Sequence, residues 1–282
     1  MNRRTTTPRA PRLGLLLLFV GCAVATLVSA CGAGARSTTA AVASAGAVTS
    51  DESPTASSVA SPAKAPSSAT PTAPEPAAAA PAPASTHTAA RTDPSKATLK
   101  APNSFVVRFD TDAGAFRVRL TRSWAPQGVD RFYNLVVSGY FRDIAIFRAI
   151  RGFMLQFGVH GDPAVSAVWR DASIPDDPVQ THVASNRRGT LTFAMAGPNT
   201  RTTQLFINLG NNARLDRMGF PPIGQIVSGE GVLGSINTEY GEGAPAGRGP
   251  SQARVQMEGN VYLRRSFPRL TRIRSITLVP AE

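Results

Sequence analysis

The chain has 282 residues and a formal net charge of +12. A basic balance indicates nucleic-acid binding when the positive charges form a patch with interleaved aromatic residues. Here several arginines lie within the first twelve residues and the others are scattered singly, so the composition does not support a nucleic-acid partner and favours an ordinary solvated surface.

The N-terminal residues have the pattern of an export signal. Residues 1–12 include four arginines, and residues 13–30 contain no charged side chain. A positive segment followed by an apolar one is typical of a secretory signal peptide. Residues 28–31 (VSAC) then resemble the bacterial lipobox, in which the cysteine receives a lipid. The sequence therefore predicts a signal peptide over residues 1–30 and lipid attachment at Cys31.

Three other interpretations of this segment are open: ordinary cleavage that leaves a soluble protein, an uncleaved membrane anchor, and a cysteine placed by chance in an apolar run. The run is just long enough to span a bilayer, but its second half is rich in Ala, Ser, Thr and Gly. The lipoprotein interpretation places the protein in a bacterial cell envelope, anchored to the membrane by the lipid. In a Gram-negative host we expect the periplasmic face of the outer membrane.

Residues 31–100 are predicted to form a disordered linker. From residue 32 to residue 102 the chain contains no aromatic residue and consists mostly of Ala, Ser, Thr, Pro, Gly and Val. Such a composition cannot bury enough apolar surface to fold, and its proline-rich parts favour extended backbone. Only the remaining part, residues 101–282, is expected to form a folded domain.

The folded part begins with a predicted hairpin and a helix. Residues 104–111 and 114–120 are predicted strands joined by a turn at Asp112-Ala113. Apolar residues at helical spacing predict a helix over residues 127–138, with Gly139 as its stop. Further strands are predicted at residues 144–150, 153–158, 190–196, 204–209, 222–228 and 272–279, and a second short helix near Gly229.

Many short strands with few helices favour a β-sandwich or a closed barrel. The sequence has no internal repeat, no Gly-rich phosphate loop and no nucleophile elbow, and its three histidines are isolated. Hydrolase, nucleotide-binding and metal-binding classes therefore lack support, and we expect no cofactor.

Two segments indicate a family. Residues 147–158 (FRAIRGFMLQFG) resemble the first cyclophilin motif. Residues 188–200 (RGTLTFAMAGPNT), followed by residues 203–207 (TQLFI), resemble the second. The resemblance extends from about Ser104 to the C-terminus and implies a mainly β fold, a closed eight-stranded antiparallel β-barrel with two helices. Residues 162–187 and 240–270 are more irregular than the family pattern and receive no assignment.

The resemblance implies an activity as well as a fold. A peptide bond before proline isomerises slowly because resonance gives its C–N bond partial double-bond character, with a barrier of roughly 18–20 kcal/mol for peptide bonds in general. A group that localises the nitrogen lone pair lowers this barrier. By resemblance that group is Arg148, whose guanidinium is always charged and offers several rigid donors. No nucleophile or base is needed.

By the same resemblance, the substrate site combines an apolar surface for the proline ring, two anchoring glutamines and a backbone segment that holds the peptide. These residues are Phe153, Met154, Phe206, Leu215 and Phe220, then Gln156 and Gln204, then Ala194, Met195 and Ala196. One departure concerns a drug: Arg214 stands where eukaryotic cyclophilins often carry Trp, which puts cyclosporin binding in doubt.

The sequence therefore predicts a monomeric peptidyl-prolyl cis/trans isomerase that acts on proline-containing peptides and unfolded exported proteins. The main alternative is a non-catalytic peptide-binding or chaperone module on the same barrel, which loss of Arg148 would have favoured. A structural envelope tether is a third possibility, which wall-binding motifs in the linker would have favoured.

Overall fold

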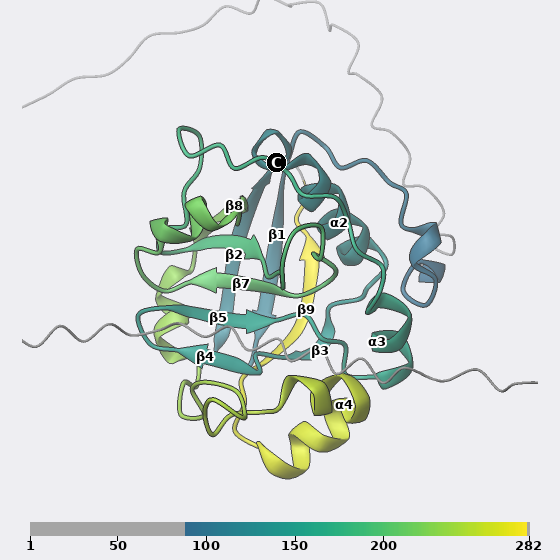
Figure 1. The fold of residues 1–282 in the computed structure, drawn as a ribbon, viewed down its shortest axis with the longest axis vertical. Helices are drawn as coiled ribbons and strands as arrows, with labels where there is room; N and C mark the ends of the chain where they lie inside the picture. Colours follow the sequence, from purple (N-terminus) through teal and green to yellow (C-terminus); the bar gives the residue numbers. More distant parts are fainter. Residues whose placement is uncertain (1–87, 281–282) are drawn as a thin grey trace, which may run out of the picture. The chain divides into compact units, whose positions relative to one another are not determined.

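An antiparallel sheet of nine strands forms the centre of the part that the computed structural model describes, residues 88–280 (Figure 1). The predicted signal, Cys31 and most of the predicted linker lie outside these residues. The strands are β1 (Ser104–Thr111), β2 (Gly114–Thr121), β3 (Arg142–Ala145), β4 (Arg148–Ile150), β5 (Met154–Phe157), β6 (Thr190–Phe193), β7 (Leu205–Asn208), β8 (Pro222–Ser228) and β9 (Arg272–Leu278). Their order across the sheet is β3-β9-β1-β2-β8-β6-β7-β5-β4.

The two end strands of the sheet are consecutive in the chain. Only Ile146 and Phe147 separate β3 from β4, so the sheet must curl until its ends approach. No ladder joins β3 to β4 among the described strands. The predicted closed barrel of eight strands is therefore not confirmed, and the structure is a curled, open sheet of nine.

The ninth strand arises because the predicted strand 144–150 is divided in two. At the break, the backbone N–H of Ile146 donates to the carbonyl of Thr271 (3.0 Å). The side chain of Phe147 is buried in a second apolar cluster away from the main core. The chain thus leaves the β9 side of the sheet and enters the β5 side within two residues.

Three α-helices are described, α2 (Pro126–Val137), α3 (Pro163–Trp169) and α4 (Gln252–Ser266). The predicted helix over residues 127–138 is confirmed as α2. The second predicted helix is a 3-10 turn, η4 (Glu230–Ser235), and the expected total of two helices is wrong because α3 and α4 occupy the two unassigned stretches. The other 3-10 turns are η1 (Pro94–Lys96), η2 (Arg122–Trp124) and η3 (Ala213–Met218). None of the helices in this described part has the length and hydrophobicity to cross a bilayer.

The predicted hairpin is confirmed. Thr111 pairs with Gly114 across a turn at Asp112-Ala113, and Gly114 adopts a φ of 128° that a side chain would disfavour. The hydroxyl of Thr111 donates to the Gly114 carbonyl (2.6 Å) and accepts from the Ala113 N–H (3.1 Å). These contacts set the register of β1 and β2.

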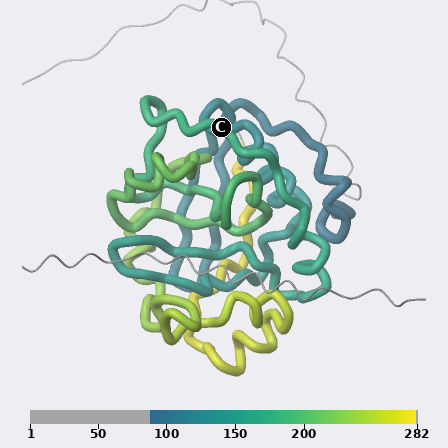
Figure 2. The backbone as a smooth tube through the Cα atoms, viewed as in Figure 1, coloured from purple at the N-terminus to yellow at the C-terminus, as the bar shows by residue number. Residues whose placement is uncertain are grey.

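Two apolar clusters fill the domain. The main core lies between the sheet and α2 and contains Phe109 stacked on Phe116, with ring centres 4.7 Å apart. The second cluster joins α4, through Val255, Tyr262 and Leu263, to Ala145, Phe147 and Val159, with Leu270. In Figures 1 and 2, α4 accordingly lies beyond the β3 and β4 end of the sheet.

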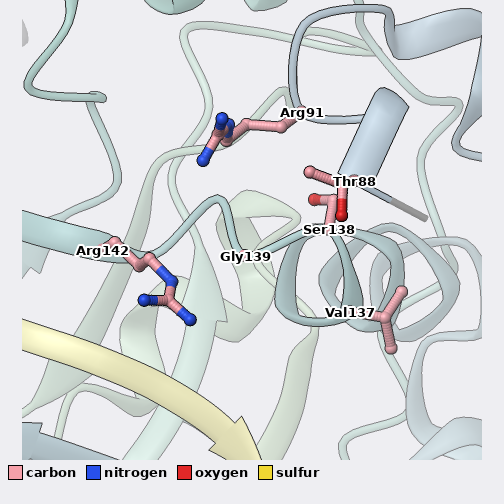
Figure 3. A pocket seen from close by; sticks show the side chains of 6 residues that line it. All are labelled: Thr88, Arg91, Val137, Ser138, Gly139 and Arg142. Atoms are coloured by element: carbon pink, nitrogen blue, oxygen red, sulfur yellow. The ribbon is translucent and has the colours of Figure 1, made fainter. Parts of the chain in front are cut away.

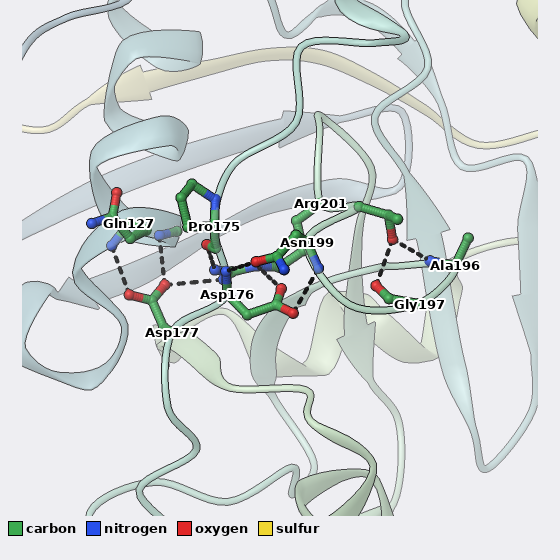
Figure 4. A network of polar contacts seen from close by, with 10 residues as sticks. Gln127, Pro175, Asp176, Asp177, Ala196, Gly197, Asn199 and Arg201 are labelled. Carbon is green, nitrogen blue, oxygen red and sulfur yellow. Dashed lines mark hydrogen bonds and ion pairs between the residues drawn. The ribbon is translucent and has the colours of Figure 1, made fainter.

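The start of α2 is capped from a distant segment. Ala125 precedes the helix and has no side chain that can cap it. Instead, the carboxylate of Asp177 accepts from the backbone N–H groups of Gln127 (2.8 Å) and Gly128 (2.9 Å) (Figure 4). The same carboxylate pairs with Nη1 of Arg201 at 3.0 Å. A negative charge at a helix N-terminus is favourable, so Asp177 serves the helix and the arginine together.

We expect Arg201→Met to destabilise the fold by about 3–5 kcal/mol. The Arg201 side chain is 0% exposed, and removing one partner of a buried pair leaves the other charge uncompensated. Denaturant unfolding followed by circular dichroism measures the change. Arg108→Met is the control, because its pair with Asp110 lies at the surface, and it should leave the midpoint almost unchanged. Equal midpoints for the two variants would contradict the assignment.

Candidate active site

Three neighbouring strands place the predicted catalytic residue beside predicted substrate residues. Arg148 of β4 is paired with Gln156 of β5, and Gln156 is paired with Phe206 of β7. Residues directly opposite each other in antiparallel strands project from the same face of the sheet. The side chains of these three residues therefore share one face.

The five predicted apolar residues come together at this place. Met154, Phe206 and Leu215 form a small buried cluster, and Phe153 and Phe220 pack against it half-buried. Ile150 and Ala194 complete the set, which we call the site cluster. The rings of Phe206 and Phe220 meet edge to face, with centres 6.0 Å apart. The cluster is separate from the main core and offers partly exposed aromatic surface.

The two predicted glutamines connect to the arginine in a line of hydrogen bonds. Nη1 of Arg148 donates to Oε1 of Gln156 (3.0 Å), and Nε2 of Gln156 donates to Oε1 of Gln204 (3.0 Å). The Arg148 guanidinium carbon lies 6.0 Å from the centre of the Phe153 ring. The charged group therefore lies at the edge of the site cluster.

The predicted backbone segment adjoins the cluster but is not a strand. β6 ends at Phe193, so the prediction that the strand continues to Ala196 is wrong. The N–H of Ala194 donates to the Gln204 carbonyl (2.9 Å) and that of Ala196 to the Thr200 hydroxyl (2.8 Å). After β6 ends at Phe193, residues 196–199 form a bend and a turn. Met195 lies over η3, where a Cβ on Gly219 would come within 3.3 Å of its methyl group.

A buried polar network holds the η3 side of the site cluster. The side-chain amide of Asn186 donates to the Asp216 carboxylate (2.7 Å) and to the Phe220 carbonyl (2.7 Å). Asn208 donates to Oδ1 of Asn186 (3.0 Å), and Asn212 donates to Oδ1 of Asn208 (2.7 Å). The network fixes η3, and with it Leu215, against the sheet. Sequence reasoning missed these residues, because single Asn and Asp side chains near turns look like ordinary loop residues.

Two charged residues complete the surroundings. The carboxylate of Glu242 contacts Arg148, with Oε1 2.6 Å from Nε and Oε2 2.6 Å from Nη2. The guanidinium carbon of Arg214 lies 5.1 Å from the centre of the Phe153 ring, within the range of a cation–π contact. Glu242 comes from the stretch 240–270 that the sequence left unassigned. No spacing or motif connects it to an arginine 94 positions earlier.

A hollow elsewhere on the domain contains none of the predicted site residues. It has a volume of about 340 Å³ and is lined by Thr88, Arg91, Val137, Ser138, Gly139 and Arg142 (Figure 3). It lies at the C-terminal end of α2, which carries the negative pole of the helix dipole. Because none of the predicted site residues lines this hollow, we place the candidate site at the site cluster. Within residues 88–280, no three His, Cys, Asp or Glu side chains gather in a way that could hold a metal ion.

The site can act on a backbone amide next to an apolar ring. A guanidinium carries five N–H groups. Nη2 donates one N–H to Glu242 and Nη1 donates one to Gln156, while Nε lies 2.6 Å from Glu242 as an ion pair without a hydrogen bond. One N–H on each Nη thus has no protein partner among the described contacts, and the Arg148 side chain is 26% exposed. Two donors of a charged group are thus unshared at the edge of an apolar cluster.

Comparisons of the sequence with known proteins indicate a single family. The sequence model of the family described as "Cyclophilin type peptidyl-prolyl cis-trans isomerase/CLD" matches residues 106–259. A mouse protein named peptidyl-prolyl cis-trans isomerase-like 3 is 30% identical over 135 residues, which cover 46% of this chain and 80% of the relative. Peptidyl-prolyl cis-trans isomerase-like 2 from Neurospora crassa is 34% identical over 128 residues, 43% of this chain and only 20% of that longer protein.

Solved structures also match this chain. A crystal structure of a Cryptosporidium parvum cyclophilin-type isomerase superposes with a TM-score of 0.48 at 21% identity, covering 64% of this chain and 99% of that one. A TM-score below 0.5 carries no argument, and the family follows from the sequence model, which matches more than half of the chain. The chain belongs to the cyclophilin-type peptidyl-prolyl cis-trans isomerase family.

Proposed function

We propose that this protein catalyses cis/trans isomerisation of peptide bonds before proline, with Arg148 as the catalytic residue. The observation that carries the proposal is the position of the Arg148 guanidinium at the edge of the site cluster, with two unshared N–H groups on a side chain that is 26% exposed. An apolar cluster alone could bind a proline ring. The charged donor beside it adds the group that the reaction requires.

The chemistry follows from where charge is localised during rotation. In the planar peptide the nitrogen lone pair is delocalised into the carbonyl. In the twisted state it is confined to the nitrogen and becomes a hydrogen-bond acceptor. A guanidinium that donates to this nitrogen binds the twisted state more strongly than the planar one, and only such differential binding accelerates a reaction.

The remaining predicted residues hold the substrate while the bond rotates. Phe153, Met154, Phe206, Leu215 and Phe220 would pack around the proline ring and keep it still. Gln156 and Gln204, already in line with Arg148, would anchor the peptide, and the segment 194–196 would contact its backbone. The ring is then fixed, so rotation must occur on the other side of the bond.

We expect Arg148→Ala to lower kcat/KM for a prolyl peptide by roughly ten- to a hundredfold. A hydrogen bond to a charged group that forms in the twisted state contributes about 1.5–3 kcal/mol. A prolyl-peptide isomerisation assay on the purified protein measures the change, with circular dichroism to show that the variant is folded. The control is Arg119→Ala, since Arg119 is an exposed arginine on β2.

The same assay separates the proposal from its alternative. A folded wild-type protein that binds prolyl peptides without accelerating their isomerisation would favour the peptide-binding or chaperone module. Normal turnover in Arg148→Ala would show that another residue performs the catalysis.

We propose in addition that the mature protein is a lipoprotein of a bacterial cell envelope, tethered through Cys31, where it assists the folding of exported proteins. The support is confined to the sequence: the arginine-rich start, the uncharged residues 13–30 and the small residues before Cys31. The relatives described above are eukaryotic and carry no weight on this point. A long proline-rich linker would give the domain reach from the membrane.

In a bacterial host, mass spectrometry of the mature protein should find an N-terminal Cys31 carrying a lipid. Cys31→Ser should leave the protein unlipidated and shift it from the membrane fraction to the soluble fraction, because the thiol is the acceptor for the lipid. Cys22→Ser is the control and should change neither result. A mature N-terminus at any other residue would refute the proposal.

Arg214 gives a test of the alignment around η3. Its guanidinium packs on Phe153, where the resemblance expects an indole that strengthens cyclosporin binding. We expect Arg214→Trp to tighten cyclosporin binding by at least about tenfold, or about 1.4 kcal/mol, because a flat ring loses less freedom on binding than a hydrated arginine. Calorimetric titration measures it, with Arg217→Trp as control. Unchanged affinity would mean that Arg214 does not occupy that position.

A further inference from the structure

The contact between Glu242 and Arg148 has a defined geometry. The carboxylate meets the side edge of the guanidinium, Oε1 at Nε and Oε2 at Nη2, both at 2.6 Å. Nη2 donates a charge-assisted hydrogen bond to Oε2, whereas the Nε–H makes no hydrogen bond and Nε is held near Oε1 only as an ion pair. One N–H of Nη1 and one of Nη2 have no protein partner among the described contacts, and the side chain is 26% exposed. Glu242 therefore holds the arginine while two of its donors stay unshared.

The loop of residues 240–250 is folded around Glu242. The Glu242 carbonyl accepts from the N–H of Gly249 (2.8 Å), and its Oε1 accepts from the N–H of Gly243 (2.8 Å). Gly247 and Gly249 approach the same carbonyl so closely that an added Cβ would lie 2.3 Å and 2.8 Å from it. Only glycine permits such an approach. The backbone thus specifies the place of this one side chain.

The loop is tied to the domain on both sides. Next to the site, the N–H of Ala149 in β4 donates to the Gly241 carbonyl (3.4 Å). On the other side, Tyr240 packs edge to face on Phe267, with ring centres 5.1 Å apart, and the N–H of Ser251 donates to the Tyr262 hydroxyl (3.2 Å). Phe267 and Tyr262 belong to the α4 end of the domain. Glu242 is therefore held by α4 as well as by β4.

Two opposite effects of the carboxylate must be weighed. Its negative charge reduces the positive potential that Arg148 presents to a peptide, which would weaken catalysis. It also prevents a long, partly exposed side chain from sampling other rotamers, and pre-orientation of a donor lowers the barrier because no reorganisation is needed during the reaction. The arrangement favours the second effect, since two N–H groups of the guanidinium stay without a protein partner and Gly247 and Gly249 permit the loop that holds Glu242.

We propose that Glu242 is a positioning residue for prolyl isomerisation, holding Arg148 in the orientation in which its outer N–H groups meet the substrate. The inference rests on the function proposed above. It assigns a role to the irregular stretch 240–250, whose glycines and anchoring aromatic residues all serve the placement of one carboxylate. The bound peptide contacts Arg148 and not Glu242.

The test is a double-mutant cycle on the full protein with Glu242→Gln, Glu242→Ala and Arg148→Ala. We expect Glu242→Ala to lower kcat by at least about tenfold and Glu242→Gln by about threefold, with KM changed less than about twofold, because positioning affects the twisted state more than substrate binding. In the Arg148→Ala background, replacing Glu242 should have no further effect. Glu239→Gln is the matched control, since Glu239 belongs to the same part of the chain but pairs with the exposed Arg269.

The outcomes are distinguishable. If Arg148→Ala keeps normal turnover, both the proposed function and the positioning role are wrong. If Arg148→Ala is impaired while folded Glu242→Gln and Glu242→Ala have normal kcat, only the positioning role is wrong. Higher kcat in Glu242→Ala would make the carboxylate an inhibitory contact and would also refute it. If replacing Glu242 lowers kcat equally in the presence and absence of Arg148, the effect is merely structural. The near-isosteric Glu242→Gln variant guards against misfolding.

Discussion

The fold depends on a positive charge in a place that water does not reach. The Arg201 side chain is 0% exposed, and a guanidinium cannot lose its proton to escape burial. Asp177 neutralises it and at the same time caps α2, and Asp176 lies 3.3 Å from Nε of the same guanidinium. Helix α2, the segment that contains Asp176 and Asp177, and the segment that contains Arg201 just before β7 must therefore assemble together. Burial and the Arg201 charge also lower the pKa of nearby Arg131 to about 10.

Part of the candidate site lies just after Arg201 in the chain. Gln204 lies three positions after Arg201 and directly before β7, which carries Phe206 into the site cluster. Two polar systems then hold opposite sides of the cluster. The Asn186 and Asp216 network fixes η3, and the contact with Glu242 fixes Arg148. Both are made of hydrogen bonds with buried or half-buried partners, whose loss leaves a polar group unsatisfied, so the apolar surface between them keeps its shape.

The sequence was most informative where a short segment contains the whole signal. The hairpin at Asp112-Ala113 and the helix α2 could be predicted because turn chemistry and helical periodicity are local. The two motifs also located Arg148 and the site cluster, since each motif lies on strands that pair with one another. Predictions failed at strand ends, at Ile146 and Ala194, where hydrogen bonds to distant residues such as Thr271 and Gln204 decide the backbone direction.

The sequence by itself determined the family, the mainly antiparallel β architecture and the residues that come together in the site cluster. Only the tertiary structure decided that the sheet stays open with nine strands, that Asp177 caps α2 from 50 positions away, and that Glu242 meets Arg148. The physical reason is common to all three. A charged or backbone group needs a partner, but nothing in its neighbours along the chain specifies which distant residue the packed core will bring within hydrogen-bonding distance.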